Sequence, residues 1–259
     1  MLEISAIAVI AHRDFVKLLR DRLRIVADFA LPLTLVLLLG PTLQAGYGQS
    51  GGNEVMTFVF TGVLAQSVWQ SAALGVISLI ADREEDFSQE IFVSPISRYS
   101  IVAGKIIGES LVALPQALAI LALGVLLGVP LSPLVLLVLL PVVLAMAIYG
   151  GAFGILVLSN ISSQRTANQV FPFVMLPQFF LAGVFNPVHE LPPVLAVLSA
   201  ISPMRWAVEL VRNVYYAAEP GAGVPAISPL SVVAPVLAAS FLAFIVVGTS
   251  LFVRAERNR

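Results

Sequence analysis

Residues 134–158 read LVLLVLLPVVLAMAIYGGAFGILVL, a run of 25 residues without a charged side chain. A helix of this length rises about 37 Å, enough to cross the ~30 Å hydrocarbon core of a bilayer. Five further stretches have a similar apolar character. The predicted spans cover residues 29–47, 55–80, 106–129, 134–158, 167–184 and 230–253. Because these runs are continuously apolar and do not alternate, they predict an all-α membrane protein with six transmembrane helices.

The overall composition agrees with this class. Of the 259 residues, 59% are hydrophobic and 11% are charged, whereas soluble domains carry about 25% charged residues. The net charge of -1 provides no basic field of the kind that nucleic-acid binding needs, which excludes nucleic acid as a partner. The chain has no Cys and only two His, His12 and His189, so neither thiol chemistry nor a histidine metal cluster is expected.

The distribution of Lys and Arg predicts the orientation. If the N-terminus is cytoplasmic, twelve of the 14 Lys and Arg residues lie in cytoplasmic segments, and the two exceptions lie in residues 185–229. The positive-inside rule therefore places both termini and the loop 82–105 in the cytoplasm and residues 185–229 outside. This topology is that of a multi-pass protein of the inner (plasma) membrane. Glu109 is the only charged residue in the predicted spans, and we interpret it as a boundary residue that reaches the cytoplasmic interface.

The N-terminal segment, residues 2–26, predicts an amphipathic helix. Four basic side chains fall within an arc of roughly 60° on a helical projection: Arg13, Lys17, Arg20 and Arg24. We expect this arc to face anionic head groups at the inner membrane surface, with lipids as its partners. We accordingly divide the chain into an interfacial helix, 1–28, and a six-span domain, 29–259. The alternative is a soluble helix that packs on a cytoplasmic partner.

Between the second and third predicted spans, residues 82–95 read DREEDFSQEIFVSP. The pattern predicts a short helix that ends before Pro95, on which Phe87 and Ile91 share one face among acidic side chains. A large apolar side chain on an acidic, solvated helix indicates a docking surface. The alternative is a solvated charge run that keeps the loop out of the membrane. A carboxylate metal site is disfavoured, because consecutive acidic residues point around a helix instead of converging.

The segment 185–229 contains seven Pro and divides into two short apolar helices, 194–200 and 204–216, which we expect to re-enter or lie at the outer leaflet. Ser202 is the predicted N-cap of the second helix, and Pro203 lies in its first turn. Three side chains of this helix suit the outer head-group region: Trp206, Tyr215 and Tyr216. Three others have the spacing of helical ion pairs: Arg205, Glu209 and Arg212.

Motifs of catalysis are missing from the sequence. It has no G-x-x-x-x-G-K-[ST], no H-E-x-x-H and no G-x-S-x-G, so we expect neither an enzyme nor a bound cofactor. The pairs Gly124/Gly128 and Gly150/Gly154 fit G-x-x-x-G and predict close helix packing. Four amide side chains are candidates for lining a path through the spans: Gln66, Gln70, Gln116 and Gln178.

The acidic segment and the residues after it resemble a known family. Residues 82–90 are followed by VSPISR at 93–98 and by Gly104-Lys105. This order resembles the signature of type-2 ATP-binding cassette exporter permeases, in particular the drug-resistance and nodulation-factor branch. The resemblance extends over the chain: an interfacial N-terminal helix, six spans, and a broken external segment that carries Pro203-x-x-Trp206. The departure is Asp86-Phe87-Ser88, where many members have Gly-Thr or Gly-Phe.

The resemblance implies a permease half that works as a dimer with a second copy or a paralogue. A separate cytoplasmic ATPase subunit would bind ATP and Mg for each half, and the permease itself would have no catalytic residue. The coupling helix that docks into the ATPase would carry Glu84, Glu85, Asp86, Phe87, Glu90 and Ile91. The implied function is export of a hydrophobic or amphipathic substrate, a drug, lipid or lipid-linked glycan. The main alternative is a secondary, ion-coupled transporter, which would need titratable groups and internal repeats in the spans.

Overall fold

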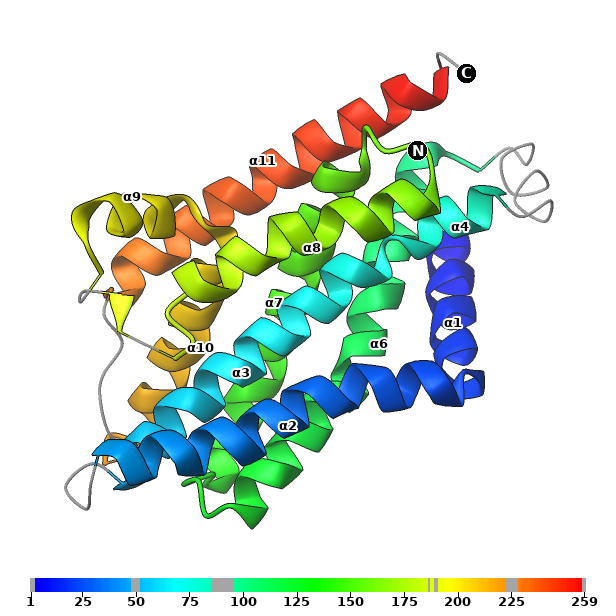
Figure 1. Cartoon of the computed structure of the whole chain (residues 1–259). Helices are drawn as coiled ribbons and strands as arrows, with labels where there is room; N and C mark the ends of the chain where they lie inside the picture. The colour runs from blue at the N-terminus through cyan, green and yellow to red at the C-terminus, as the bar shows by residue number, and fades with distance from the viewer. Residues whose placement is uncertain are drawn as a thin grey trace.

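The computed structural model describes residues 3–47, 52–84, 96–185, 187–188, 191–221 and 228–257. Within these ranges the chain is helical and has no strand, as the sequence predicts. The helices are α1 (Ile4–Arg20), α2 (Arg22–Tyr47), α3 (Gly52–Gly75), α4 (Ser78–Glu84), α6 (Arg98–Leu126), α7 (Pro133–Leu158), α8 (Gln164–Leu181), α9 (Pro193–Ile201), α10 (Pro203–Ala218) and α11 (Leu230–Arg257) (Figure 1).

Several of these helices are long and apolar enough to cross a membrane. In the part of the chain that the structure describes, four stretches meet this test: Glu54–Asp82, Arg98–Leu126, Pro133–Leu158 and Leu230–Ala255. The pair α9 and α10, bent by 83°, adds a fifth if it counts as one span. The predicted spans 29–47 and 167–184 correspond to α2, whose apolar part Asp28–Thr42 is shorter, and to α8. The structure is therefore that of a multi-pass membrane protein with four or five candidate spans.

The N-terminal helix is shorter than the sequence predicts. Asp21 leaves the helical conformation, with φ -95° and ψ 85°, and separates α1 from α2. Aspartate competes with the backbone for hydrogen bonds and is a poor residue for a helix interior, which favours a break here. Arg22 and Arg24 consequently belong to α2 and not to the amphipathic helix. Figure 1 shows that α1 turns sharply away from α2 at this point and stands at one end of the bundle.

The helix α3 lies at the centre of the fold. It packs against α2, α6, α7 and α10. Of its apolar membrane-spanning stretch 78% is buried, compared with 11% of the corresponding stretch of α11. Both chain ends and α4 gather at one end of the bundle, while α9 lies toward the other (Figure 1). The helix α4, which leads from the core into the predicted coupling segment, therefore lies at the same end of the bundle as α1.

The G-x-x-x-G pair of α7 confirms its predicted role in helix packing. A Cβ on Gly150 would lie 2.1 Å from the backbone oxygen of Trp69, and one on Gly154 would lie 2.5 Å from that of Ala73. Only glycine permits such an approach of α7 to α3. The ring of Trp69 then packs on Phe153, with 5.0 Å between ring centroids, and contributes to an aromatic core.

The helix α10 lies where predicted, but its side chains face differently. Ser202 occupies the N-cap position without a capping hydrogen bond from its side chain. The three aromatic residues expected among head groups are buried: Trp206, Tyr215 and Tyr216. The reason is that α10 packs against α3 and α7, and backbone oxygens accept hydrogen bonds from two of the three polar tips. The Tyr215 hydroxyl donates to the Pro130 oxygen at 2.6 Å, and the Trp206 indole donates to the Ala200 oxygen at 2.9 Å.

Candidate functional site

The predicted coupling residues continue directly from α4. Glu84 is the last residue of this helix and is exposed. The other members of the set lie outside the described residues: Glu85, Asp86, Phe87, Glu90 and Ile91. Glu84 Oε1 accepts a hydrogen bond of 3.0 Å from the backbone N–H of Gln164, at the start of α8. A carboxylate at a helix N-terminus is electrostatically favourable, so the contact links the end of α4 to α8.

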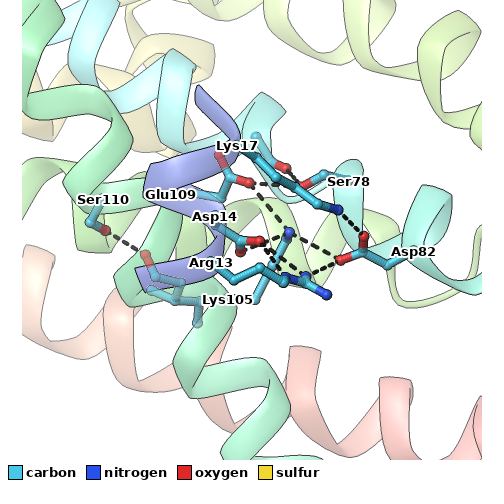
Figure 2. A network of polar contacts seen from close by, with 10 residues as sticks. Arg13, Asp14, Lys17, Ser78, Asp82, Lys105, Glu109 and Ser110 are labelled. Atoms are coloured by element: carbon cyan, nitrogen blue, oxygen red, sulfur yellow. Dashed lines mark hydrogen bonds and ion pairs between the residues drawn. The ribbon is translucent and has the colours of Figure 1, made fainter. Parts of the chain in front are cut away.

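Among the residues that the structure describes, six charged side chains form a cluster that joins α1, α4 and α6 (Figure 2). We call it the buried ion cluster, and its members are Arg13, Asp14, Lys17, Asp82, Lys105 and Glu109. Three of these side chains are basic and three are acidic, so their formal charges cancel. Neutrality is what permits such a group to lie in an apolar bundle, because an unpaired charge there would be costly.

Lys105 is at the centre of the buried ion cluster. Its Nζ lies 2.9 Å from Asp14 Oδ2 and 3.5 Å from both Asp82 Oδ2 and Glu109 Oε1. Lys105 and Glu109 are each 1% exposed, and Asp14 is 2% exposed. Glu109 also accepts a hydrogen bond of 2.7 Å from the Ser78 hydroxyl. Glu109, predicted from the sequence to lie at the membrane boundary, is therefore a buried member of an ion cluster.

Asp82 forms ion pairs with two basic side chains of the N-terminal helix α1. Lys17 Nζ lies 2.9 Å from Asp82 Oδ1, and the guanidinium of Arg13 pairs with both Asp82 and Asp14. Burial disfavours the charged form of Arg13, but the two carboxylates outweigh it and raise its pKa. Arg13 and Lys17, predicted to face lipid head groups, are thus paired within the protein. Arg20 remains exposed, and Arg24 belongs to α2.

A glycine on α6 allows the N-terminal helix to come close. A Cβ on Gly108 would lie 3.1 Å from the backbone Cα of Ala11 and the same distance from Asp14 Oδ2. A larger side chain would push α1 away from Lys105. The N-terminal end is fastened separately, because the Glu3 N–H donates to the Ser100 hydroxyl at 2.9 Å. The helices α1 and α6 therefore form one packed pair.

Three of the four predicted path-lining glutamines meet in one groove between α2, α3, α6 and α8. Two adjoining pockets of about 170 and 380 Å³ share Leu31, Leu35, Gln66 and Gln70. Gln116 lies in the smaller pocket. The larger is lined by apolar residues of α8, among them Phe173, Leu176 and Phe180. We call the two pockets together the glutamine groove.

Gln178 lies apart from the other three glutamines. It is 7% exposed, its side chain donates to the Val174 oxygen at 3.2 Å, and its Oε1 accepts from the Met204 N–H at 3.4 Å. Its contacts hold α8 to α10, and it lines neither pocket of the glutamine groove.

The charged residues of α10 pair only in part as expected. Arg205 Nε donates to Glu209 Oε1 at 2.9 Å, as predicted. Arg212 instead donates to the backbone oxygens of Phe58 and Val184, at 3.1 and 3.3 Å, and its guanidinium lies 3.6 Å from the ring centroid of Phe58. Arg212 thereby fastens α10 to α3 and to the segment after α8. Among the residues described, no three His, Asp or Glu side chains are placed to hold a metal ion.

Comparison with known proteins gives one consistent result. Residues 5–216 match the ABC-2 type transporter family. A protein of Cyanophora paradoxa named as a transport permease, ycf38, is 26% identical over 216 residues, which span 82% of this chain and 74% of ycf38. A protein of Escherichia coli (strain K12) named as a probable multidrug ABC transporter permease, YbhR, is 31% identical over 142 residues. That match spans 54% of this chain and 38% of YbhR.

Proposed function

Because this chain belongs to the ABC-2 type transporter family, we propose that it is the membrane permease subunit of an ATP-driven exporter. Its substrate is a hydrophobic or amphipathic molecule such as a drug, a lipid or a lipid-linked glycan. ATP and Mg bind to a separate cytoplasmic ATPase subunit, and this chain carries no catalytic residue. A second permease copy or a paralogue completes the transporter. A multidrug permease among the relatives agrees with this substrate range.

The observation that carries the coupling role is the buried ion cluster. The predicted docking segment, residues 84–91, leaves α4 only two residues after Asp82, and Asp82 is paired with α1 and α6. Glu84 in turn contacts the start of α8. A rigid-body movement of the docking segment would therefore act on three helices at once. Rigid-body motions of domains are transmitted in this way, through contacts between packed elements.

The proposed membrane arrangement has six spans, formed by α2, α3 with α4, α6, α7, α8 and α11. Both termini are cytoplasmic in the inner membrane, α9 and α10 form an external re-entrant pair, and α1 lies at the inner surface with Arg20 toward lipid head groups. The grouping of α1, α4 and both chain ends at one end of the bundle supports this arrangement (Figure 1). Family membership favours it over an ion-coupled secondary transporter.

Single-cysteine labelling tests this topology directly, because the chain has no native Cys. We expect Ser88→Cys to be protected from a membrane-impermeant maleimide in intact cells and to react after permeabilisation. Gly221→Cys, at an exposed position with open space for a side chain, should react in intact cells. Labelling of Ser88→Cys in intact cells would contradict the proposed orientation.

Substitutions in the docking segment test the proposed function. One shortens an apolar side chain, and the other reverses the charge of two acidic side chains. We expect Phe87→Ala, and Glu84→Lys combined with Glu85→Lys, to release the ATPase or to uncouple ATP hydrolysis from export. An apolar side chain of this size contributes about 1.5–3 kcal/mol when buried, enough to weaken docking by at least an order of magnitude. The measurements are co-purification of the ATPase and substrate-stimulated hydrolysis in proteoliposomes.

Two comparisons separate docking from local damage. Glu54→Lys reverses an exposed acidic residue at the start of α3, far along the chain from the docking segment, and should leave co-purification unchanged. Glu85→Lys alone spares the contact between Glu84 and α8. Normal docking and coupling in both Phe87→Ala and the double charge reversal would mean that the segment is only a solvated charge run.

A further inference from the structure

The glutamine groove contains two buried oxygen atoms that accept no hydrogen bond from the described part of the chain. Gln66 is 2% exposed and Gln116 is 5% exposed, and Oε1 of each has no hydrogen-bond partner among the residues described. Both side chains line the smaller pocket, whose other polar lining residues are Asp28, Ser67, Gln70 and Ser71. Buried acceptors without a partner are rare in native proteins, because they have lost water without gaining a replacement.

The orientation of the Gln116 side-chain amide follows from its contact with the backbone of α2. Its Nε2 lies 2.5 Å from the backbone oxygen of Asp28. A backbone oxygen can only accept, so the atom that faces it must be the NH₂ end of the amide. In the pair of amides formed by Gln66 and Gln70, Gln66 Nε2 donates to Gln70 Oε1 at 2.8 Å. Both amides thus spend a donor inside the protein and leave an acceptor unused.

The larger pocket has a different chemistry. Its α8 side is formed by Phe173, Leu176 and Phe180, which are 81%, 61% and 67% exposed. No charged residue lines this pocket. Since the two pockets share Leu31, Leu35, Gln66 and Gln70, a single molecule can lie against the glutamine side chains at one end and the apolar side chains at the other.

We propose that the glutamine groove binds an amphipathic molecule through a hydrogen-bond-donating head, an ammonium or a hydroxyl group, with its apolar body against α8. Gln66 Oε1 and Gln116 Oε1 accept from the head. Heads that only accept, such as carboxylates and sulfates, and quaternary ammonium heads without N–H groups are disfavoured. The proposal narrows the substrate class of the exporter and in that respect rests on the proposed function.

The test compares three probes with the same tail. The full chain in lipid nanodiscs is equilibrated with labelled dodecylamine, dodecyltrimethylammonium or dodecanoate, and binding to empty nanodiscs is subtracted. We expect dodecylamine to bind about tenfold more tightly than dodecyltrimethylammonium, which has the same charge but no N–H donor, and dodecanoate to bind least. Equal binding of the two cations would overturn the proposal.

Variants of the acceptors locate the effect. Gln116→Met and Gln66→Met remove one acceptor each with little change in volume, and each should reduce the tenfold preference for dodecylamine by about threefold, since two acceptors share it. Gln66→Met is the safer variant for folding, because the hydrogen bond that Gln66 donates to Gln70 lies within α3. Gln169→Met, at an exposed position of α8 that lines neither pocket, should keep the full preference. An unchanged preference in a folded Gln66→Met variant would also overturn the proposal.

The experiments distinguish a failure of the proposed head chemistry from a failure of the proposed exporter function. A preference for dodecylamine in a chain that binds no ATPase would contradict the exporter function and support the head chemistry. ATP-driven export with no preference between the two cations would overturn the head chemistry alone.

Discussion

Lys105→Met is expected to lower the free energy of unfolding by about 3–5 kcal/mol, the usual effect of removing one partner from a buried ion pair. The substitution removes the cation that lies 2.9 Å from Asp14 and 3.5 Å from Glu109, and both carboxylates are almost completely buried. Methionine has a similar length, so loss of packing is a minor part of the effect. Chemical unfolding of the purified chain in detergent micelles measures the difference.

The matched control is Lys17→Met. Lys17 belongs to the same cluster and lies 2.9 Å from Asp82, but its side chain is 51% exposed, so solvent screens the pair. We expect a loss below about 1 kcal/mol. Combining Lys105→Met with Glu109→Gln should restore much of the stability, because the formal charges of the cluster again cancel and Asp14 keeps Arg13 as a partner. If Lys105→Met and Lys17→Met are equally stable, the cluster does not hold α1 to α6.

Gly150→Ala is expected to destabilise the chain by about 3 kcal/mol or more, at the upper end of the range for overpacked cores. Its Cβ would lie 2.1 Å from the Trp69 backbone oxygen, and a backbone atom in the middle of α3 cannot move aside alone. The whole contact between α7 and α3 would have to open. Fluorescence-detected gel filtration across a temperature series gives the shift in stability.

The adjacent glycine provides the comparison. A Cβ on Gly151 would lie 3.1 Å from Ile106 Cγ2, which is a side-chain atom that can shift by a few tenths of an ångström. The gain in helix propensity from Gly to Ala offsets this crowding, so Gly151→Ala should stay within about 1 kcal/mol of the wild type. Similar losses for the two variants would show that the α7–α3 contact is not as tight as the geometry indicates.

The long apolar helices were predictable because their signal is local. The predicted span 134–158 differs from α7, Pro133–Leu158, by a single residue, and Ser132 caps it through a bond from the Val135 N–H. The number of spans was harder to predict from the sequence, since α8 contains Pro172 and Pro177 and is less apolar than the other predicted spans. A helix of this kind depends on its neighbours for stability in the membrane.

The buried ion cluster was not predicted, because its members come from three separate segments. One signal was present: Glu109 lies inside a predicted span, and Lys105 precedes it by one helical turn. An ionisable residue at such a depth needs a partner. Asp14 gave no comparable signal, because the amphipathic pattern of α1 suggests a lipid-facing helix whether its basic side chains meet phosphates or carboxylates.

The aromatic residues of α10 show a similar limit. The preference of Trp and Tyr for membrane interfaces describes helices at a lipid surface. Tyr215 and Trp206 instead place their polar tips on the backbone oxygens of Pro130 and Ala200. Which carbonyl is available in a packed core depends on the tertiary fold, so the pattern of one helix could not distinguish the two environments.

The link between Asp14 and Lys105 also has a consequence for biogenesis. The ribosome completes α1 well before it reaches α6, so in the proposed topology Asp14 waits at the inner membrane surface while α2 and α3 are inserted. The ion pair closes only if residue 105 emerges on the side where α1 remained, which requires both intervening helices to have crossed. A chain in which one of them failed to insert would expose unpaired charges and an undocked N-terminal helix. In the proposed topology, the contact that stabilises the finished permease therefore forms only in chains whose α2 and α3 have both been inserted.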